Sequence, residues 1–264
     1  MIKKIISKFL EVKNSLNLFE EKSVNQRNGF VLIKGNKYKM NLTGKEHKIN
    51  EIYIAKTLTT QEQWMEIMGE NPSYFQGEKK PVENVSWIEA LEFCNRLSRI
   101  ENKEEAYEIE NGKLTSIKYF DGEKVKPSSA DFSKVEGYRL LLELEWDFCS
   151  QDAIEIEKLA WYEGNSSGET KDVATKSPNS MGIYDLNGNV WEWVYDTENT
   201  IGKSAEKSYI YDEKSHLRRR RGGAWDSRKN IIITLNRGNG SYIDKSNNIG
   251  FRVCCTKLLE KTSL

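Results

Sequence analysis

The 264-residue sequence predicts a mixed α+β fold with little regular secondary structure. Two segments, Thr60–Gln63 and Ser86–Glu89, have the spacing of a helix capping box, and apolar residues recur after each at helical intervals. From residue 161 onward, Gly, Asn, Ser and Asp recur every few residues between aromatic side chains. This texture is typical of short strands joined by ordered loops.

Composition excludes several classes of protein. The chain has 40 Lys+Arg against 40 Asp+Glu, so no overall field attracts nucleic acid or an anionic membrane. Aromatic residues make up 11% of the chain and include seven Trp, which argues against disorder. No apolar run approaches the ~18 residues that a membrane helix needs, so we expect no integral membrane segment.

The N-terminal 21 residues predict a short amphipathic helix outside the main domain, followed by a polar linker to residue 28. Ser7, Lys8, Glu11 and Lys13 interrupt the apolar stretch that a secretory signal would need. We therefore expect an unexported, cytoplasmic protein.

The following elements are predicted in chain order. They are a strand at Phe30–Ile33, a strand at Ile49–Ile54, a helix after Thr60 that buries Trp64, a helix after Ser86 that buries Trp87 and Cys94, an insertion at 101–136 with a hairpin at Asp121-Gly122, and a helix at Leu140–Cys149.

The four cysteines, Cys94, Cys149, Cys254 and Cys255, are too few and too scattered for a disulfide framework or a CxxC zinc site. Buried free thiols in a reducing compartment are expected. Cys254 and Cys255 are neighbours on a predicted strand, so they point to opposite faces and cannot chelate one metal. Only two histidines are present, which excludes a three-histidine site within this chain.

Four segments, at residues 81–87, 182–193, 221–225 and 250–253, together carry a family resemblance. Their order and spacing resemble the formylglycine-generating enzyme family, also called the sulfatase-modifying factor family. The resemblance covers about residues 29–255 and implies a C-type-lectin-like fold with few regular elements. The expected organisation is an N-terminal helix and linker (1–28), one domain (29–255) and a C-terminal tail (256–264).

The resemblance also locates the family's chemistry. Its enzymes oxidise a sulfatase cysteine to formylglycine, using two cysteines after a Gly-Gly motif that bind copper(I), a metal that soft thiolates select. Those positions fall on Ser227 and Ile232, and the neighbouring histidine position is Arg228. We therefore expect no copper site and a non-catalytic binding or scaffold module. The alternatives are an oxidoreductase of this family with unrecognised chemistry, and a subunit that partners an intact paralogue.

The segment Asp185–Glu192 resembles a calcium site of the family's enzymes. The implied ligands are the side chains of Asp185 and Glu192 and the carbonyls of Gly188 and Val190, which suit a hard cation. Such a site would be structural. In the alternative interpretation, Asn187-Gly188 is an ordinary turn and Glu192 pairs with Arg221 or Arg252.

One helix start departs from the family pattern. The family usually has Pro and Thr where this chain has Leu141 and Leu142. Their loss is expected to cost about 1 kcal/mol of helix capping.

Residues 226–248 are rich in Asn, Ser, Ile, Gly and Asp, and this region forms much of the ligand face on lectin-like folds. Some proteins of this fold are diversified by retroelements that randomise adenines, and Asn codons altered in this way cannot encode Lys, Glu, Gln, Met or Trp. Only Lys229 and Lys245 of the stretch belong to that excluded set. The candidate ligand residues are Trp225, Asp226, Ser227, Arg228, Asn230, Asn236, Arg237 and Tyr242. The ligand would be a protein or a small molecule.

Arg218–Arg221 is the basic run of the chain. Arg221 belongs to a family motif and is expected to point inward to an acid, whereas the other three are expected on a solvated strand edge. One short run in a neutral protein predicts no nucleic-acid binding.

Overall fold

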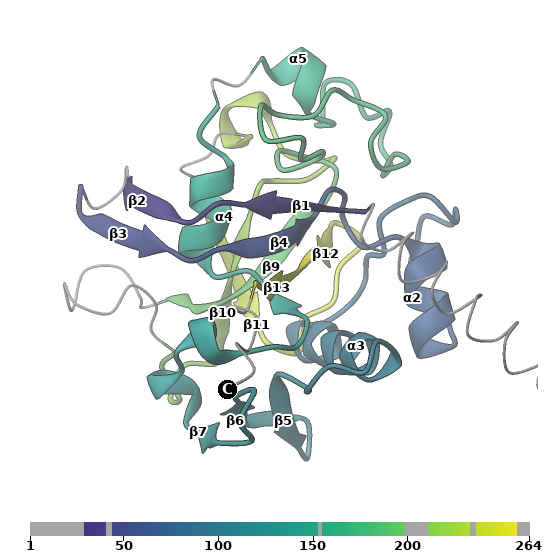
Figure 1. Ribbon diagram of the computed structural model, residues 1–264. Helices are drawn as coiled ribbons and strands as arrows, with labels where there is room; N and C mark the ends of the chain where they lie inside the picture. Colours follow the sequence, from purple (N-terminus) through teal and green to yellow (C-terminus); the bar gives the residue numbers. More distant parts are fainter. Residues whose placement is uncertain (1–28, 41–43, 153–154, 199–210, 233–235, 258–264) are drawn as a thin grey trace, which may run out of the picture.

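The computed structural model describes residues 29–40, 44–152, 155–198, 211–232 and 236–257, so the predicted N-terminal helix and residues 258–264 lie outside the described part. Two four-stranded sheets form the centre of the domain (Figure 1). The first contains β1 (Phe30–Ile33), β4 (Ile52–Ala55), β13 (Val253–Thr256) and β8 (Arg139–Leu140), in that order. The second contains β11 (Arg237–Ser241), β10 (Leu217–Arg221), β9 (Trp191–Thr197) and β12 (Ile249–Phe251), in that order.

Two smaller sheets flank this centre. One pairs β2 (Asn36–Lys39) with β3 (Glu46–Ile49), and the other contains β5 (Tyr107–Glu110), β6 (Lys113–Lys118) and β7 (Lys124–Val125). The predicted hairpin is confirmed, because Asp121-Gly122 joins β6 to β7 and Gly122 has a φ of 85°. The strand predicted at Ile49–Ile54 is wrong in extent, since β3 ends at Ile49 and β4 begins at Ile52.

The helices are short and few among the described residues. They are α2 (Gln61–Met68), α3 (Trp87–Ile100), α4 (Glu143–Cys149), α5 (Ile156–Leu159) and the 3-10 helices η1 (Pro127–Ser129), η2 (Phe132–Lys134) and η4 (Lys229–Ile231). Both predicted capping boxes are confirmed: the Thr60 hydroxyl accepts from Gln63 N and the Ser86 hydroxyl from Glu89 N. No helix in the described ranges is long and apolar enough to cross a bilayer.

Helix α4 begins at Glu143, three residues later than predicted, because Arg139 and Leu140 form strand β8. No side chain caps its N-terminus at Leu142. The Leu142 amide does donate to Glu145 Oε2 at 2.8 Å, so the glutamate half of a capping box is retained.

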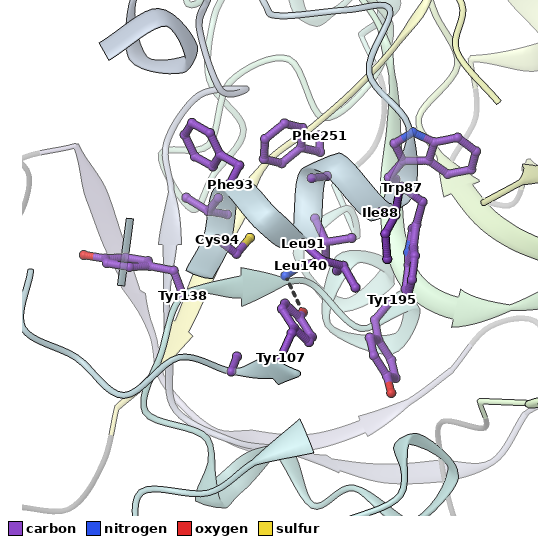
Figure 2. Close-up of a cluster of buried hydrophobic side chains, with 14 of the residues drawn as sticks. Trp87, Ile88, Leu91, Phe93, Cys94, Tyr107, Tyr138, Leu140, Tyr195 and Phe251 are labelled. Atoms are coloured by element: carbon purple, nitrogen blue, oxygen red, sulfur yellow. Dashed lines mark hydrogen bonds between the residues drawn. The ribbon is translucent and has the colours of Figure 1, made fainter. Parts of the chain in front are cut away.

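The largest cluster of buried side chains lies between α3 and the central strands (Figure 2). Phe93 and Phe251 meet edge to face with ring centroids 5.2 Å apart, and Tyr107 accepts a hydrogen bond from Leu140 N at its hydroxyl (Figure 2). Cys94 is fully buried in this cluster, as predicted. The first and last strands of the domain belong to the same sheet, where β4 lies between β1 and β13.

Candidate functional site

Ser227 and Ile232, at the positions that the resemblance assigns to thiolates, both lie against Gly223. A Cβ built on Gly223 would lie 2.4 Å from Ile232 Cδ1 and 3.6 Å from Ser227 Oγ. The Ser227 hydroxyl accepts a hydrogen bond from Ala224 N at 3.0 Å, which closes a turn. Ile232 is fully buried and packs with Ile156 and Tyr162. Both side chains are therefore used in packing and turn formation, and neither can bind a soft metal.

All four cysteines are buried and free. Cys254 packs with Trp146 and Leu141, whereas Cys255 packs in the cluster around α3, so the two point to opposite faces of β13 as predicted. Burial raises the pKa of all four thiols, that of Cys255 to about 11. The thiolate population at neutral pH is therefore small.

The segment Asp185–Glu192 is a sharp, buried loop. Asp185 and Asn189 have positive φ angles of 53° and 62°, and a Cβ on Gly188 would lie 2.1 Å from the Trp161 carbonyl oxygen. Asp185 Oδ2 accepts from Ala174 N at 2.8 Å, whereas Asp185 Oδ1 and Asn187 Oδ1 are buried without a hydrogen-bond partner. Burial raises the pKa of Asp185 to about 6, and the nearby Glu192 adds to the rise.

Glu192 makes the ion pair with Arg252 that the alternative interpretation allowed. Both of its carboxylate oxygens accept hydrogen bonds from the guanidinium. For a cation, the free oxygens of Asp185 and Asn187 fit as ligands and the engaged oxygens of Glu192 do not. Within the described ranges, no cluster of three or more His, Cys, Asp or Glu is placed to hold a metal ion.

The eight candidate ligand residues fall into three groups. Asp226, Arg228 and Asn230 are exposed; Trp225, Asn236 and Tyr242 are half-buried; Ser227 and Arg237 are held by other parts of the fold. Trp225 Nε1 donates to Asn247 O at 3.0 Å, and Asp226 Oδ2 accepts from Asn248 Nδ2 at 2.8 Å. These two bonds hold the start of the stretch against residues 247 and 248, near its end.

Arg237 belongs to a buried polar centre beneath β10 and β11. Its guanidinium donates twice to the carboxylate of Glu143, at 2.5 Å each. Arg221 bonds the same carboxylate at 3.3 Å and Asp147 Oδ1 at 2.8 Å, so its prediction as an inward-pointing arginine is confirmed. Burial raises the pKa of Asp196, which accepts from Glu143 N at 2.6 Å.

The alternation of side chains along β11 explains this division. Arg237 pairs in register with Arg221, and Asn239 pairs with Arg219. Gly238 and Gly240 face the other way, where Gly238 lies under the Arg220 side chain and Gly240 lies against Trp193. Arg237 therefore points toward the polar centre, the exposed Asn239 donates to Glu198 Oε2 at 2.8 Å, and Gly238 and Gly240 lie on the opposite face.

The family model described as "Sulfatase-modifying factor enzyme 1-like domain" matches residues 15–257 of the chain. The chain belongs to this family.

The sulfatase-modifying factor enzyme 1-like domain has a curated relative in Paenibacillus barcinonensis, described as the chaperone protein LppX. The two are 30% identical over 197 residues, which span 63% of this chain and 70% of the relative.

Solved structures share the fold. Treponema denticola variable protein 1 is 27% identical, has a TM-score of 0.69, and is matched over 86% of this chain and 95% of its own. PvdO from Pseudomonas aeruginosa is 20% identical and has a TM-score of 0.62. The match covers 86% of this chain and 94% of the PvdO chain. The domain therefore has the C-type-lectin-like fold of the formylglycine-generating enzymes, as the resemblance implied.

The expectation that Arg218, Arg219 and Arg220 of this domain lie on a solvated strand edge is wrong. Strand β10 lies between β11 and β9 inside its sheet. Arg218 is 4% exposed, and its guanidinium lies 4.6 Å from the ring centroids of Trp87 and Tyr211. The guanidinium of Arg220 lies 5.3 Å from the Trp191 ring and makes no hydrogen bond or ion pair with another described residue.

Sequence reasoning also missed an aromatic group at the surface, which we call the aromatic shelf: the exposed Tyr74 and the half-buried Phe75 and Trp225. Tyr74 meets Phe75 edge to face with centroids 4.9 Å apart, and Phe75 meets Trp225 in the same way at 5.2 Å. Only Trp225 was among the predicted ligand residues. The signal was present in the segment Asn71–Gly77, where Pro, Ser and Gly surround two adjacent aromatics.

Proposed function

We propose that this domain is a non-catalytic binding or scaffold module whose ligand face is formed by Trp225 and the residues that follow it. The observation that carries the proposal is the structural role of the Ser227 and Ile232 side chains. One closes a turn and the other fills a core, so the positions that hold copper in the family's enzymes offer no thiolate.

The exposed part of the stretch supports a binding role. Asp226, Arg228 and Asn230 offer an acid, a base and an amide next to the half-buried Trp225. Hydrogen bonds to Asn247 and Asn248 hold Trp225 and Asp226 in place. Because these two residues are already fixed, binding of a ligand would cost less conformational entropy. A chaperone acts by binding other proteins, so the description of the Paenibacillus relative is in keeping with a protein ligand.

Residues 226–248 are also proposed to vary between copies of the gene. The description of the Treponema structure as a variable protein supports this part, since that structure shares the fold over 86% of this chain. Sequencing the 3′ end of the gene in a clonal culture tests it. Substitutions confined to adenine-containing codons of this stretch, beside a template copy, are expected; an invariant stretch without a template overturns it.

The binding role is tested with two triple variants of matched charge. The face variant replaces Asp226, Arg228 and Asn230 with Ala. The control variant replaces the exposed Lys113, Thr115 and Glu123, on and beside the β5–β6–β7 sheet, with Ala. Host proteins that bind the wild type are expected to bind the control variant as well, and not to bind the face variant. An intact paralogue among them would make this chain its partner subunit.

The alternative, a formylglycine-generating-type oxidoreductase, is tested with copper(I), oxygen and a sulfatase peptide that contains the target cysteine. No conversion of that cysteine is expected. Any conversion would overturn the non-catalytic assignment. Conversion that survives replacement of each cysteine of this chain by Ser would in addition show that the reaction needs no thiolate from this chain.

We further propose that the loop Asp185–Glu192 can take one structural calcium ion through the Asp185 side chain and the carbonyls of Gly188 and Val190, with Asn187 in place of Glu192, whose oxygens are both engaged by Arg252. The buried, unpartnered side-chain oxygens of Asp185 and Asn187 support this, and the hard oxygen donors suit the ion. A cytoplasmic location is also proposed, supported by the four free cysteine thiols.

A further inference from the structure

The aromatic shelf presents Tyr74 unusually openly. Tyr74 is 71% exposed, the largest exposed fraction among the large hydrophobic side chains of the described residues. Phe75 meets Tyr74 at an interplanar angle of 89° and Trp225 at 84°, so each neighbouring pair is perpendicular. The shelf therefore offers ring surface in more than one direction.

Buried polar groups fix the loop that carries the shelf. Gln61, which is 1% exposed, donates to Phe75 O at 2.7 Å and accepts from Gly77 N at 3.0 Å. The buried carboxyl of Glu83 accepts from Phe75 N at 2.7 Å, and Asn84 Nδ2 donates to Pro72 O at 2.9 Å. The loop is ordered before any partner arrives, so binding would lose little further loop entropy.

The segment around the shelf is acidic. Residues 57–78 contain four glutamates, Glu62, Glu66, Glu70 and Glu78, and no lysine or arginine. All four are exposed, as is Asp226 directly after Trp225. The bases nearby are Lys79, Lys80 and the exposed Arg228, and the Lys80 ammonium is paired with Glu169 at 2.8 Å. The five exposed acids therefore outnumber the two bases that remain, Lys79 and Arg228.

The shelf already accommodates one cation of its own chain. The Lys80 ammonium lies 5.8 Å from the Phe75 ring centroid. Aromatic faces attract cations, and surrounding carboxylates add to that attraction. The combination of the open Tyr74 ring and an acidic rim selects a positively charged partner over an acidic one.

We propose that the aromatic shelf binds a basic polypeptide segment, with an arginine or lysine side chain over the open face of Tyr74. The inference rests on the proposed function, because it names the class of partner for the same face. The shelf supplies fixed contacts, and residues 226–248 supply contacts that differ with sequence.

The test titrates the full chain with three fluorescent peptides, (Arg-Gly)₄, (Gln-Gly)₄ and (Glu-Gly)₄, by anisotropy at physiological salt. The arginine peptide is expected to bind more tightly than the other two. Tyr74→Ala is expected to weaken its binding about threefold to fivefold, while Tyr74→Phe retains it. Tyr53→Ala is the matched control, since Tyr53 is an exposed tyrosine on β4.

Equal binding of the three peptides, or equal effects of Tyr74→Ala and Tyr53→Ala, would overturn the inference. Its failure can be told apart from failure of the proposed function. If the peptides do not discriminate but the face variant still loses a partner that the control variant keeps, the ligand face stands and the basic partner does not.

Discussion

The guanidinium of Arg252 forms a two-point ion pair with the carboxylate of Glu192. Nε lies 2.9 Å from Oε2 and Nη2 lies 3.1 Å from Oε1, with both side chains buried. The same guanidinium donates to the carbonyl oxygens of Ala55 at 3.0 Å and Tyr184 at 2.8 Å. One side chain thus joins β4, the loop before Asp185 and strand β9.

Arg252→Ala should destabilise the domain strongly. It leaves the buried carboxylate of Glu192 without its partner and two carbonyls without a donor, a change that typically costs about 3–5 kcal/mol. Urea denaturation measures the free energy of unfolding. Arg228→Ala, at an exposed arginine, is the control and should change it by less than about 0.5 kcal/mol. Similar losses for the two variants would contradict the bridging role of Arg252.

Asp185 should make stability depend on pH. Burial raises its pKa from 3.8 to about 6 in the folded state, so the folded protein holds the proton more tightly than the unfolded chain. This contribution is fully present below about pH 4 and is lost as the pH rises through 6. Asp185→Asn keeps the acceptor for Ala174 N and removes the titration. Its free energy of unfolding should fall less than that of the wild type between pH 4 and 7.

Calcium should raise the melting temperature of the wild type at pH 7.5, because binding to the folded state alone stabilises it by mass action. Asp185→Asn and Asn187→Ala should each reduce this rise. Magnesium serves as the comparison, since it demands a tighter octahedral site. A melting temperature that is unchanged by millimolar calcium would contradict the proposed ion site.

Arg237 and Arg228, both predicted as ligand residues, should behave differently when replaced by Ala. Arg237→Ala strips the buried Glu143 of two hydrogen bonds and should cost about 2–4 kcal/mol of stability. Arg228→Ala should leave stability unchanged and reduce ligand binding. A double-mutant cycle with Glu143→Gln checks the first statement, and a coupling near zero would contradict it.

The four thiols should resist labelling in the folded protein. Each is buried and has a raised pKa, so maleimide should react only after unfolding. A denatured sample, in which all four thiols label, is the control. Rapid labelling of one thiol in the folded state would instead favour the oxidoreductase alternative.

Local features were predictable from the sequence because neighbouring residues decide them. The capping boxes at Thr60 and Ser86 need only residues three positions apart, and Cys94 lies on a helical apolar stripe. The fold was predictable from the family motifs, because their order and spacing are specific to the family. Arg221 could be assigned to an inward position from its motif, although its partners could not.

Long-range pairing was not predictable. The Arg218 side chain is buried because its guanidinium packs against Trp87 of α3 and Tyr211, and no local signal in the sequence reports the contact with Trp87. Arg237 meets Glu143 across 94 positions of sequence, so it looked like a free loop arginine. Tyr74 and Trp225 come together through Phe75 in the same way.

The most direct test of the ligand face compares quantitative capture of host proteins by the wild type, the face variant and the control variant at equal folded concentration. If the ligand face binds a host protein, the wild type and the control variant should recover that protein equally. The face variant should recover less than about a fifth of that amount, because a loss of about 1 kcal/mol of binding free energy weakens binding about fivefold. Equal recovery of every protein by the face and control variants would contradict the proposed ligand face.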